Sequence, residues 1–282
     1  MLDVAFATHE EREEIAQFMV TAFPRAKWDI TGWRKLLANR WGAPGDPFAL
    51  RVRDAGRIVG CLGLVSARRP TEAGEAHTCG MSSWYMLKDY RGTGAGKEML
   101  EMAVQQEGVT VVNFASSVKA APVVEAAGLV PLETHRHIWV PGNGARAEVS
   151  NTLEALAALN ERDRRILADH TGLNVVPWAV EGPEGPFLIL LSPMKKHDDY
   201  TNYELFYCGN RLAFSECARA IANAVVPEGD VLAVDSRFVT GCVDPDRTEP
   251  LSLPRFYTPG RMAPEHVDHI YSENILLGIK IH

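Results

Sequence analysis

The sequence predicts a mixed α/β fold with two halves of similar element order. An amphipathic helix near the N-terminus carries apolar residues at positions i, i+3, i+4 and i+7, namely Ile15, Phe18, Met19 and Ala22. A glycine-rich segment at 91–96 joins a long apolar strand to another helix. Pro141-Gly142-Asn143-Gly144 is typical of a boundary, and beyond it the order helix, strands, helix, strand returns. We therefore expect domains at 1–145 and 146–282.

The first half is expected to follow the order β-α-α-β-β-β-α-β-α-β. Thr8 and Glu11 form a capping-box pattern that begins the first helix, and Pro24 ends this helix. Residues 54–56, Asp-Ala-Gly, predict a turn between two strands. The expected strands are Asp3–Ala7, Phe48–Val52, Ile58–Ser66, His77–Leu87, Val109–Phe114 and Val130–Val140, and the later helices contain Trp33–Leu37, Lys97–Gln106 and Ser117–Gly128.

In the second half, Asn151 and Glu154 resemble another capping box, which predicts a helix that extends to Asp169. The proline-rich stretch Pro245–Pro264 leads to a final strand at Ile270–Ile281. The other expected elements are strands at Leu173–Val180, Phe187–Leu191, Tyr203–Cys208 and Val231–Val234 and a helix at Phe214–Val225.

Composition narrows the function classes. Apolar residues make up 46% of the chain, so it contains enough apolar material for a packed core, and a formal net charge of −7 gives no global attraction to nucleic acid. No apolar run approaches the ~18 residues that span a bilayer, and the N-terminus lacks the pattern of a signal peptide. The five cysteines are scattered, without a Cys-x-x-Cys pair. We expect a reduced, cytoplasmic enzyme without a metal, a membrane or a nucleic-acid partner.

The segment from Trp84 to Lys97 carries the chemistry. It reads as a strand, a glycine-rich turn and a helix. Glycines allow consecutive backbone N–H groups to point into one concavity, and the helix N-terminus adds partial positive charge. These features predict a phosphate or pyrophosphate site. A P-loop is disfavoured because Gly92 lies one residue too close to Gly96 and Glu98 replaces the magnesium-binding hydroxyl. The spacing also departs from the dinucleotide-binding Gly-x-Gly-x-x-Gly.

The pattern Arg91-x-x-Gly94-x-Gly96, after a strand and before a helix, resembles the pyrophosphate-binding motif of the GNAT acyltransferases. The element order of residues 1–140 and the alanine-rich segment Ser117–Leu129 are also similar to that family. The alternative is an ordinary glycine-rich turn. The resemblance implies a GNAT fold and acetyl-CoA, or another acyl-CoA, as co-substrate. It implies that cofactor contacts come from Trp84, Tyr85, Met86, Arg91, Gly92, Thr93, Gly94, Ala95, Gly96, Lys97 and Ser117.

The resemblance also implies direct attack of a neutral amine on the thioester carbonyl, with the oxyanion held by a strand N–H such as that of Met86. The chain departs from the family here. Val124 occupies the position where many family members have a Tyr that acts as the general acid. The strand before the loop offers Thr78, Gly80 and Ser82 in place of a Glu or His base. Ser82 can at most hold a water. Ser117 replaces an Asn that contacts the cofactor, and a hydroxyl substitutes for it in part.

Two histidines on the Val130–Val140 strand are further candidates. His135 and His137 alternate, so both lie on one face, and in this family that strand is near the acceptor. An imidazole has a suitable pKa for a base, which makes His137 a catalytic candidate beside Ser117 and Ser82, and His135 a substrate-binding one. The alternative is a pair of surface or structural histidines.

The second half lacks Arg-x-x-Gly-x-Gly and has Tyr207-Cys208-Gly209-Asn210-Arg211-Leu212 at the corresponding point. We interpret it as a degenerate GNAT-like domain that has lost cofactor binding. This tandem layout resembles acyltransferases that act on nucleotide-linked amino sugars, which implies that Arg255 meets a phosphate and that Tyr257 or Trp28 stacks on a ring. Each of these residues also has an ordinary structural interpretation.

The leading hypothesis is an acyl-CoA dependent N-acyltransferase for a small primary amine, possibly a nucleotide-linked amino sugar. Another small amine, such as an antibiotic or a thiol precursor, is the alternative within enzymes; mycothiol synthase is also a tandem GNAT protein. The alternative that is not an enzyme is a non-catalytic acyl-CoA-binding protein, because the usual general acid and base are missing. We expect a monomer, with a dimer as the other possibility, since two halves can bury internally the face that single units use to dimerise.

Overall fold

The computed structural model describes residues 1–72, 74–196 and 200–279. The chain divides into two compact units, and each unit contains segments from distant parts of the sequence. The first unit contains residues 1–132, 253–263 and 271–279, and the second contains 133–252 and 264–270. The boundary predicted at 145/146 lies inside the second unit.

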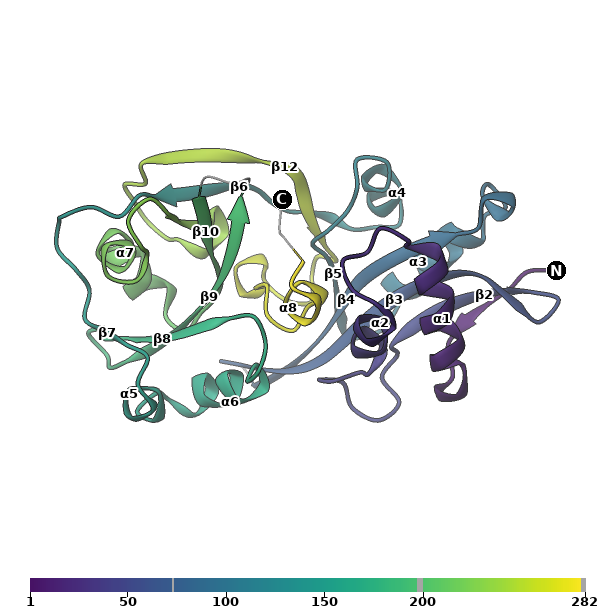
Figure 1. The fold of residues 1–282 in the computed structure, drawn as a ribbon, viewed down its shortest axis with the longest axis horizontal. Helices are drawn as coiled ribbons and strands as arrows, with labels where there is room; N and C mark the ends of the chain where they lie inside the picture. The colour runs from purple at the N-terminus through teal and green to yellow at the C-terminus, as the bar shows by residue number, and fades with distance from the viewer. Residues whose placement is uncertain (73, 197–199, 280–282) are drawn as a thin grey trace. The chain divides into compact units, whose positions relative to one another are not determined.

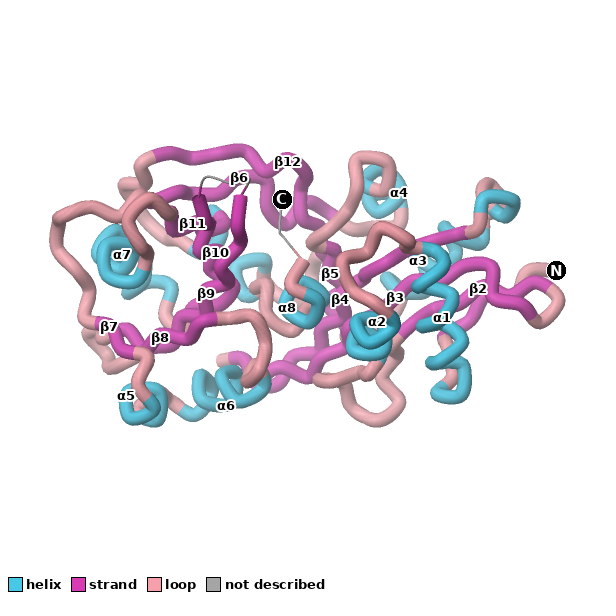
Figure 2. Tube along the Cα trace, viewed as in Figure 1, coloured by secondary structure: helices cyan, strands magenta, loops and turns pink. Residues whose placement is uncertain are grey.

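The first unit is built on a mixed sheet with the strand order β1-β2-β3-β4-β5-β12. All neighbouring strands are antiparallel except β4 and β5, which are parallel. The proline-rich stretch forms β12 because its last residues, Phe256 and Tyr257, pair with Asn113 and Val112 of β5. The strands are β1 Asp3–Phe6, β2 Ala49–Asp54, β3 Arg57–Thr71, β4 Gly74–Met86, β5 Val109–Asn113 and β12 Arg247–Tyr257 (Figures 1 and 2).

Helices cover both faces of this sheet. One face belongs to α1 and α2, because a Cβ built at Gly63 of β3 would lie 3.4 Å from Met19 and 3.2 Å from Leu36. The alternate residues Leu62 and Leu64 pack with α3 and α4 in one buried apolar cluster. The helix α8 lies beside α2 (Figure 1). The helices are α1 Arg12–Ala22, α2 Ile30–Leu37, α3 Ala95–Val104, α4 Ala121–Ala126 and α8 Glu273–Leu277.

Strand β4 has two features that position the site. Its pairing with β5 ends at Gly80 and Val112, whereas β4 itself continues to Met86. The two parallel strands therefore separate beyond Gly80. The register between β3 and β4 also shifts between Gly63/Ser82 and Cys61/Tyr85, and Ser83 adopts a φ of 55°. This bulge places a non-glycine residue in the left-handed region, which costs about 1–3 kcal/mol and is common next to functional sites.

The second unit repeats the strand arrangement of the first. Its order is β7-β8-β9-β10-β11-β6, again with a single parallel pair, β10 and β11. The sixth strands are exchanged: β6 comes from the first half of the sequence, and β12 of the first unit comes from the second half. The elements are β6 Val130–Trp139, β7 Val149–Ser150, β8 Val176–Val180, β9 Phe187–Lys196, β10 Tyr200–Cys208, β11 Val231–Asp235, α5 Leu153–Ala157, α6 Glu161–Asp169 and α7 Arg211–Val225.

The mixed α/β fold is confirmed, and so is the capping pattern at Thr8, whose backbone N–H donates to the Glu11 carboxylate at 2.8 Å. Two local predictions were wrong. The helix expected at 151–169 is two helices, because Thr152 caps α5 and Asn160 caps α6 with side-chain oxygens. The final strand expected at Ile270–Ile281 is the helix α8; residues 280 and 281 of that range lie outside the described residues.

Candidate active site

The glycine-rich loop presents unpaired backbone amides at the start of α3. Gly92 and Gly94 have φ values of 79° and 92°, and no atom lies within 4 Å of a Cβ built at either residue. Gly94 is the N-cap and supplies no side-chain acceptor, and the first helical bond runs from Glu98 N–H to the Gly94 carbonyl. The amides before Glu98 are therefore available to an anion.

A groove lies over this loop and contains most of the predicted cofactor residues. Arg91 contributes to its shape, since its Nε donates to the Met86 carbonyl at 3.0 Å and its guanidinium lies over the Tyr85 ring. Thr93 and Ala95 are not in the groove wall. Lys119 is a cation that the sequence reasoning missed. The wall is formed by Trp84, Tyr85, Met86, Tyr90, Arg91, Gly92, Gly94, Gly96, Lys97, Ser117, Lys119, Ala120 and Val123.

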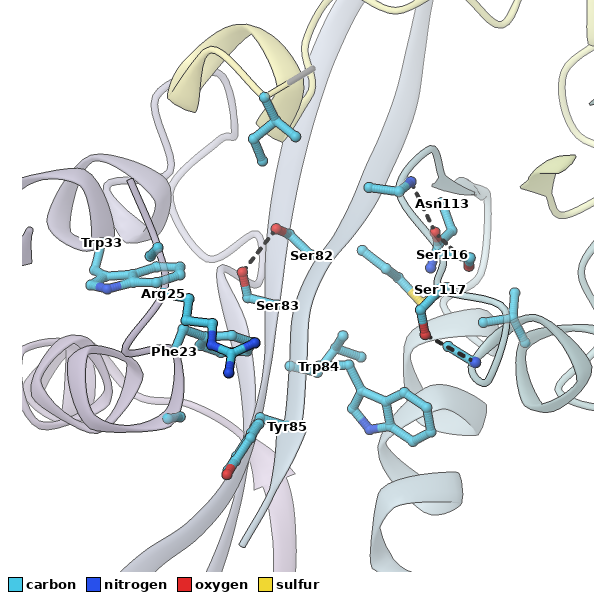
Figure 3. Close-up of a pocket in the computed structure, with 18 of the residues that line it drawn as sticks. Phe23, Arg25, Trp33, Ser82, Ser83, Trp84, Tyr85, Asn113, Ser116 and Ser117 are labelled. Carbon is cyan, nitrogen blue, oxygen red and sulfur yellow. Dashed lines mark hydrogen bonds between the residues drawn. The ribbon is translucent and has the colours of Figure 1, made fainter. Parts of the chain in front are cut away.

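A second pocket, of about 720 Å³, lies around the β4 bulge. Its aromatic wall comes from the connection between α1 and α2 and includes Phe23, Trp28 and Trp33. Figure 3 shows Phe23, Arg25 and Trp33 on one side of β4, with Asn113, Ser116 and Ser117 on the other. Trp28 was predicted to bind substrate, and the predicted site residues Ser82, Ser117, Trp84 and Tyr85 also line this pocket. Phe23 and Trp33 were missed, although aromatic residues around the helix-ending Pro24 were a usable signal.

The two pockets meet. Trp84, Tyr85, Ser117 and Ala120 line both of them. Because side chains alternate along a strand, the neighbours Trp84 and Tyr85 serve both sides of β4. A Cβ at Gly96 of α3 would lie 3.2 Å from the Trp84 ring, whereas Tyr85 contacts Phe23, with ring centroids 5.4 Å apart. A ligand that lies in the groove can therefore present its end to the second pocket.

Polar groups in the second pocket are mostly neutral. Ser82 and Ser83 share a hydrogen bond of 3.1 Å, and the Ser116 hydroxyl donates to Asn113 Oδ1 at 2.9 Å (Figure 3). Ser117 Oγ accepts from the Ala120 N–H at 3.2 Å, which begins the turn before α4. Arg25 is exposed, and in the described structure it forms neither a hydrogen bond nor an ion pair. No carboxylate or imidazole is among the described residues of the wall.

The other candidates lie elsewhere. His135 and His137 are in the second unit, where their Nδ1 atoms are 2.9 Å from the hydroxyls of Thr134 and Thr248. Burial lowers the pKa of His137 below its usual value. Arg255 and Tyr257 belong to the first unit but are 1% and 8% exposed. Among the described wall residues of either pocket, none of these four side chains occurs.

The corresponding loop of the second unit differs in a way that matters chemically. Asn210 caps α7 by accepting from the Ala213 N–H at 3.0 Å, so a side chain already occupies this helix N-terminus. A Cβ at Gly209 would overlap the Asp163 carboxylate at 2.3 Å, which shows how tightly the loop is packed. Only the first unit therefore presents an open helix N-terminus at this point of the fold, within the residues described.

Two classes of site find no support in the described part of the chain. No group of three or more His, Cys, Asp or Glu residues is arranged to hold a metal ion there. No described helix is long and apolar enough to cross a membrane.

Comparison with known proteins gives a consistent result. Residues 11–121 match the acetyltransferase (GNAT) family. A GCN5-related N-acetyltransferase from Anabaena variabilis ATCC 29413 is similar in structure, with a TM-score of 0.59 and 10% identity over 91% of this chain and 72% of that one. Eis1 from Mycobacterium abscessus has a TM-score of 0.52 and 12% identity, over 90% of this chain and 73% of its own. No curated protein sequence matches significantly. At these identities the structural likeness shows a common fold.

Proposed function

We propose that the chain is an acyltransferase that uses acetyl-CoA as co-substrate and acylates the primary amine of a small molecule, because residues 11–121 match the GNAT family. The observation that carries the proposal is the junction of the two pockets at Trp84, Tyr85, Ser117 and Ala120. One pocket has the free amides that suit a pyrophosphate, and the other has an aromatic wall that suits an organic acceptor.

The residues of the groove suit the charge and shape of an acyl-CoA. The amides between Gly92 and Lys97 would bind the pyrophosphate, and the Lys119 ammonium, which has no ion-pair partner in the described structure, would approach its negative charge. The part of β4 beyond Gly80 has no strand partner on its β5 side, so its backbone can bind an extended pantetheine arm as an added strand would. In this arrangement the thioester would lie near Ser82–Tyr85.

The second pocket suggests the nature of the acceptor. Phe23, Trp28 and Trp33 would hold a flat or apolar body, and Arg25 would meet an anionic group. Aromatic amino acids have these features. Nucleotide-linked amino sugars have them too, with the base on the aromatic wall and the phosphates at Arg25 in place of the buried Arg255. The amine of either molecule would then attack the thioester carbonyl at the junction.

The test is thiol release from acetyl-CoA with phenylalanine, phenylethylamine, glucosamine, a UDP-linked amino sugar and a lysine-containing peptide. We expect turnover with at least one small amine. The variants Trp28→Ala and Arg25→Ala should raise the KM for that amine about tenfold and leave the KM for acetyl-CoA unchanged. Lys27→Ala is the matched control, because Lys27 is exposed in the same connection and is not part of the wall.

Three outcomes would change the proposal. Turnover of the peptide alone would replace the small-molecule acceptor with a polypeptide. Binding of acetyl-CoA without thiol release for any amine would favour the non-catalytic acyl-CoA-binding protein. Equal effects of Lys27→Ala and Arg25→Ala would show that the aromatic pocket does not receive the acceptor.

A further inference from the structure

The proposed reaction needs a group that removes a proton from the attacking amine, and the described wall of the pocket has none. Its ionisable side chains are Arg25 and Tyr85, which are poor bases near neutral pH. The hydroxyls of Ser82 and Ser83 do not ionise in this range. Among the described residues, a proton acceptor would therefore lie behind this wall.

One carboxylate occupies such a place. Glu273 is the first residue of α8 and is 1% exposed. Neither of its carboxylate oxygens has a hydrogen-bond partner on another described residue, and the same is true of the side-chain amide of Asn274 next to it. A buried carboxylate without a partner is costly for stability, so it usually has a functional reason or a bound water.

The carboxylate lies where β4 and β5 separate. A Cβ built at Gly80 would be 3.2 Å from Glu273 Oε2 and 3.8 Å from Val112, so all three share one face of the sheet. Gly80 and Val112 form the last pair between the two strands. The residues that follow them, Met81, Ser82 and Asn113, already line the acceptor pocket, as does Ile279 beyond α8. Glu273 thus lies next to the part of β4 and β5 that leads directly into the pocket wall.

Strand geometry gives the separation between Gly80, which lies beside Glu273, and Ser82, which lines the pocket. Residues two apart on a strand lie on the same face and are separated by about 6.6 Å. Gly80 and Ser82 precede the bulge, so they keep this alternation, and Ser82 pairs with Gly63 while Gly80 pairs with Val65. One water between the carboxylate and the Ser82 end of the pocket spans such a gap.

We propose that Glu273, a residue from the C-terminal segment, is the proton acceptor for the amine and acts through a water beside Ser82. This proposal rests on the proposed function. The amine nitrogen forms a bond to the thioester carbonyl carbon, and its proton passes through the water to the Glu273 carboxylate. The C–S bond then breaks, and the departing thiolate takes up a proton to leave as free CoA thiol. The carboxylic acid on Glu273 supplies that proton, so the group returns to its ionised form.

The electrostatic surroundings suit this role. Burial raises the pKa of Glu273 to about 7, against a smaller lowering by its own backbone N–H. A carboxyl group with this pKa is partly ionised at neutral pH and is a stronger base than an ordinary glutamate. Its charge is also one cause of the raised pKa of the Cys79 thiol. Other charged or titratable groups stand on the neighbouring elements: Arg34 and Lys35 on α2, Arg57, Cys61, Arg68 and Arg69 on β3, Glu75, His77 and Tyr85 on β4, and Arg247, Glu249, Arg255 and Tyr257 on β12.

The experiment compares pH profiles of kcat/KM from pH 5.5 to 9 for the wild type, Glu273→Gln and Glu273→Asp, with the panel amine that reacts fastest. The wild-type rate should rise through an apparent pKa near 7. Glu273→Gln should not show this rise of kcat/KM with pH, which we call the rising limb. Its kcat should fall at least a hundredfold, because general bases contribute about 10²–10⁴-fold. Glu273→Asp should keep the limb at a lower rate. Asn274→Ala, in the same helix, is the control and should keep the wild-type limb.

Acetyl-CoA affinity, measured by calorimetry for each variant, shows whether the fold and the groove are intact. A Glu273→Gln variant that binds acetyl-CoA normally, and that keeps the wild-type kcat and the rising limb of its pH profile, would overturn the role of Glu273 and leave the proposed function in place. A wild type that neither binds acetyl-CoA nor acylates any amine would overturn the proposed function, and the role of Glu273 with it. A loss of the limb in Asn274→Ala as well would also contradict the assignment.

Discussion

The burial of Glu273 should destabilise the folded chain in a pH-dependent manner. Its pKa rises from the usual 4.5 to about 7 on folding. The folded state therefore holds this proton more tightly than the unfolded state does, and stability falls as pH rises above 4.5. The loss is complete once the pH exceeds the folded pKa. At ~1.36 kcal/mol per pH unit, the full effect is about 3 kcal/mol, most of which falls between pH 5 and pH 8.

Glu273→Gln removes this penalty because the amide stays neutral at every pH. Urea unfolding, followed by tryptophan fluorescence, gives the free energy of unfolding of the variant and of the wild type at pH 5 and at pH 8. The effect is the change, between the two pH values, in the difference between these two free energies. We expect the free energy of unfolding of Glu273→Gln to rise by about 2–3 kcal/mol relative to that of the wild type over this interval. Asn274→Ala, which changes an equally buried neighbour that does not titrate, should show a pH-independent difference. If the difference in unfolding free energy between Glu273→Gln and the wild type is the same at pH 5 and pH 8 within about 0.5 kcal/mol, the reasoning is refuted.

Three further perturbations test other parts of the structure. Val124 is 1% exposed and lines the acceptor pocket, so Val124→Ala should make room for a longer acyl chain. The ratio of kcat/KM for hexanoyl-CoA to that for acetyl-CoA should rise about tenfold, because each buried methylene contributes ~0.8 kcal/mol; an unchanged ratio would show that the acyl chain lies elsewhere. Lys119→Ala should weaken acetyl-CoA binding up to about fivefold at low salt and less at high salt, as calorimetry can show; equal affinity would remove Lys119 from the groove. Asp163→Ala should cost about 3 kcal/mol or more in urea unfolding, because the Tyr207 hydroxyl at 2.6 Å and the Leu188 N–H at 2.9 Å lose their acceptor; a loss below 1 kcal/mol would contradict this.

The groove could be predicted from sequence because its chemistry is local. Gly92 and Gly94 occupy left-handed backbone conformations that other residues rarely adopt, and the helix after them begins at once, so a short motif specifies the amide geometry. The fold class was predictable for a similar reason, since strand and helix periodicities are visible over a few residues.

The acceptor pocket was harder because long-range contacts create it. The Ser83 bulge has no sequence signal, yet it shifts the alternation of β4, so that Tyr85 lies on the same face as Ser82 and Trp84 on the other. Trp33 looks like a core residue in the sequence, and it is indeed 2% exposed while it still lines the pocket. Sequence alone cannot distinguish a ring that fills a core from a ring that borders a cavity.

The C-terminal segment shows the clearest limit. Its isoleucines and leucines suggest a strand, but α8 is buried on nearly all sides, so no polar face reveals the helical period. The placement of Glu273 against Gly80 joins residues almost two hundred positions apart. The exchange of β6 and β12 between the units has the same origin, because strand pairing over such separations depends on packing of the whole unit.

Calorimetric titration with acetyl-CoA tests the central claim most directly, on the wild type and on two glycine variants. Gly94→Trp places a ring over the amides of the loop, whereas Gly74→Trp makes the same change at another exposed glycine with positive φ, away from both pockets. We expect the wild type and Gly74→Trp to bind acetyl-CoA and Gly94→Trp to lose binding. Binding that survives in Gly94→Trp, or is absent from the wild type, would contradict an acyl-CoA site at the Arg91–Lys97 loop.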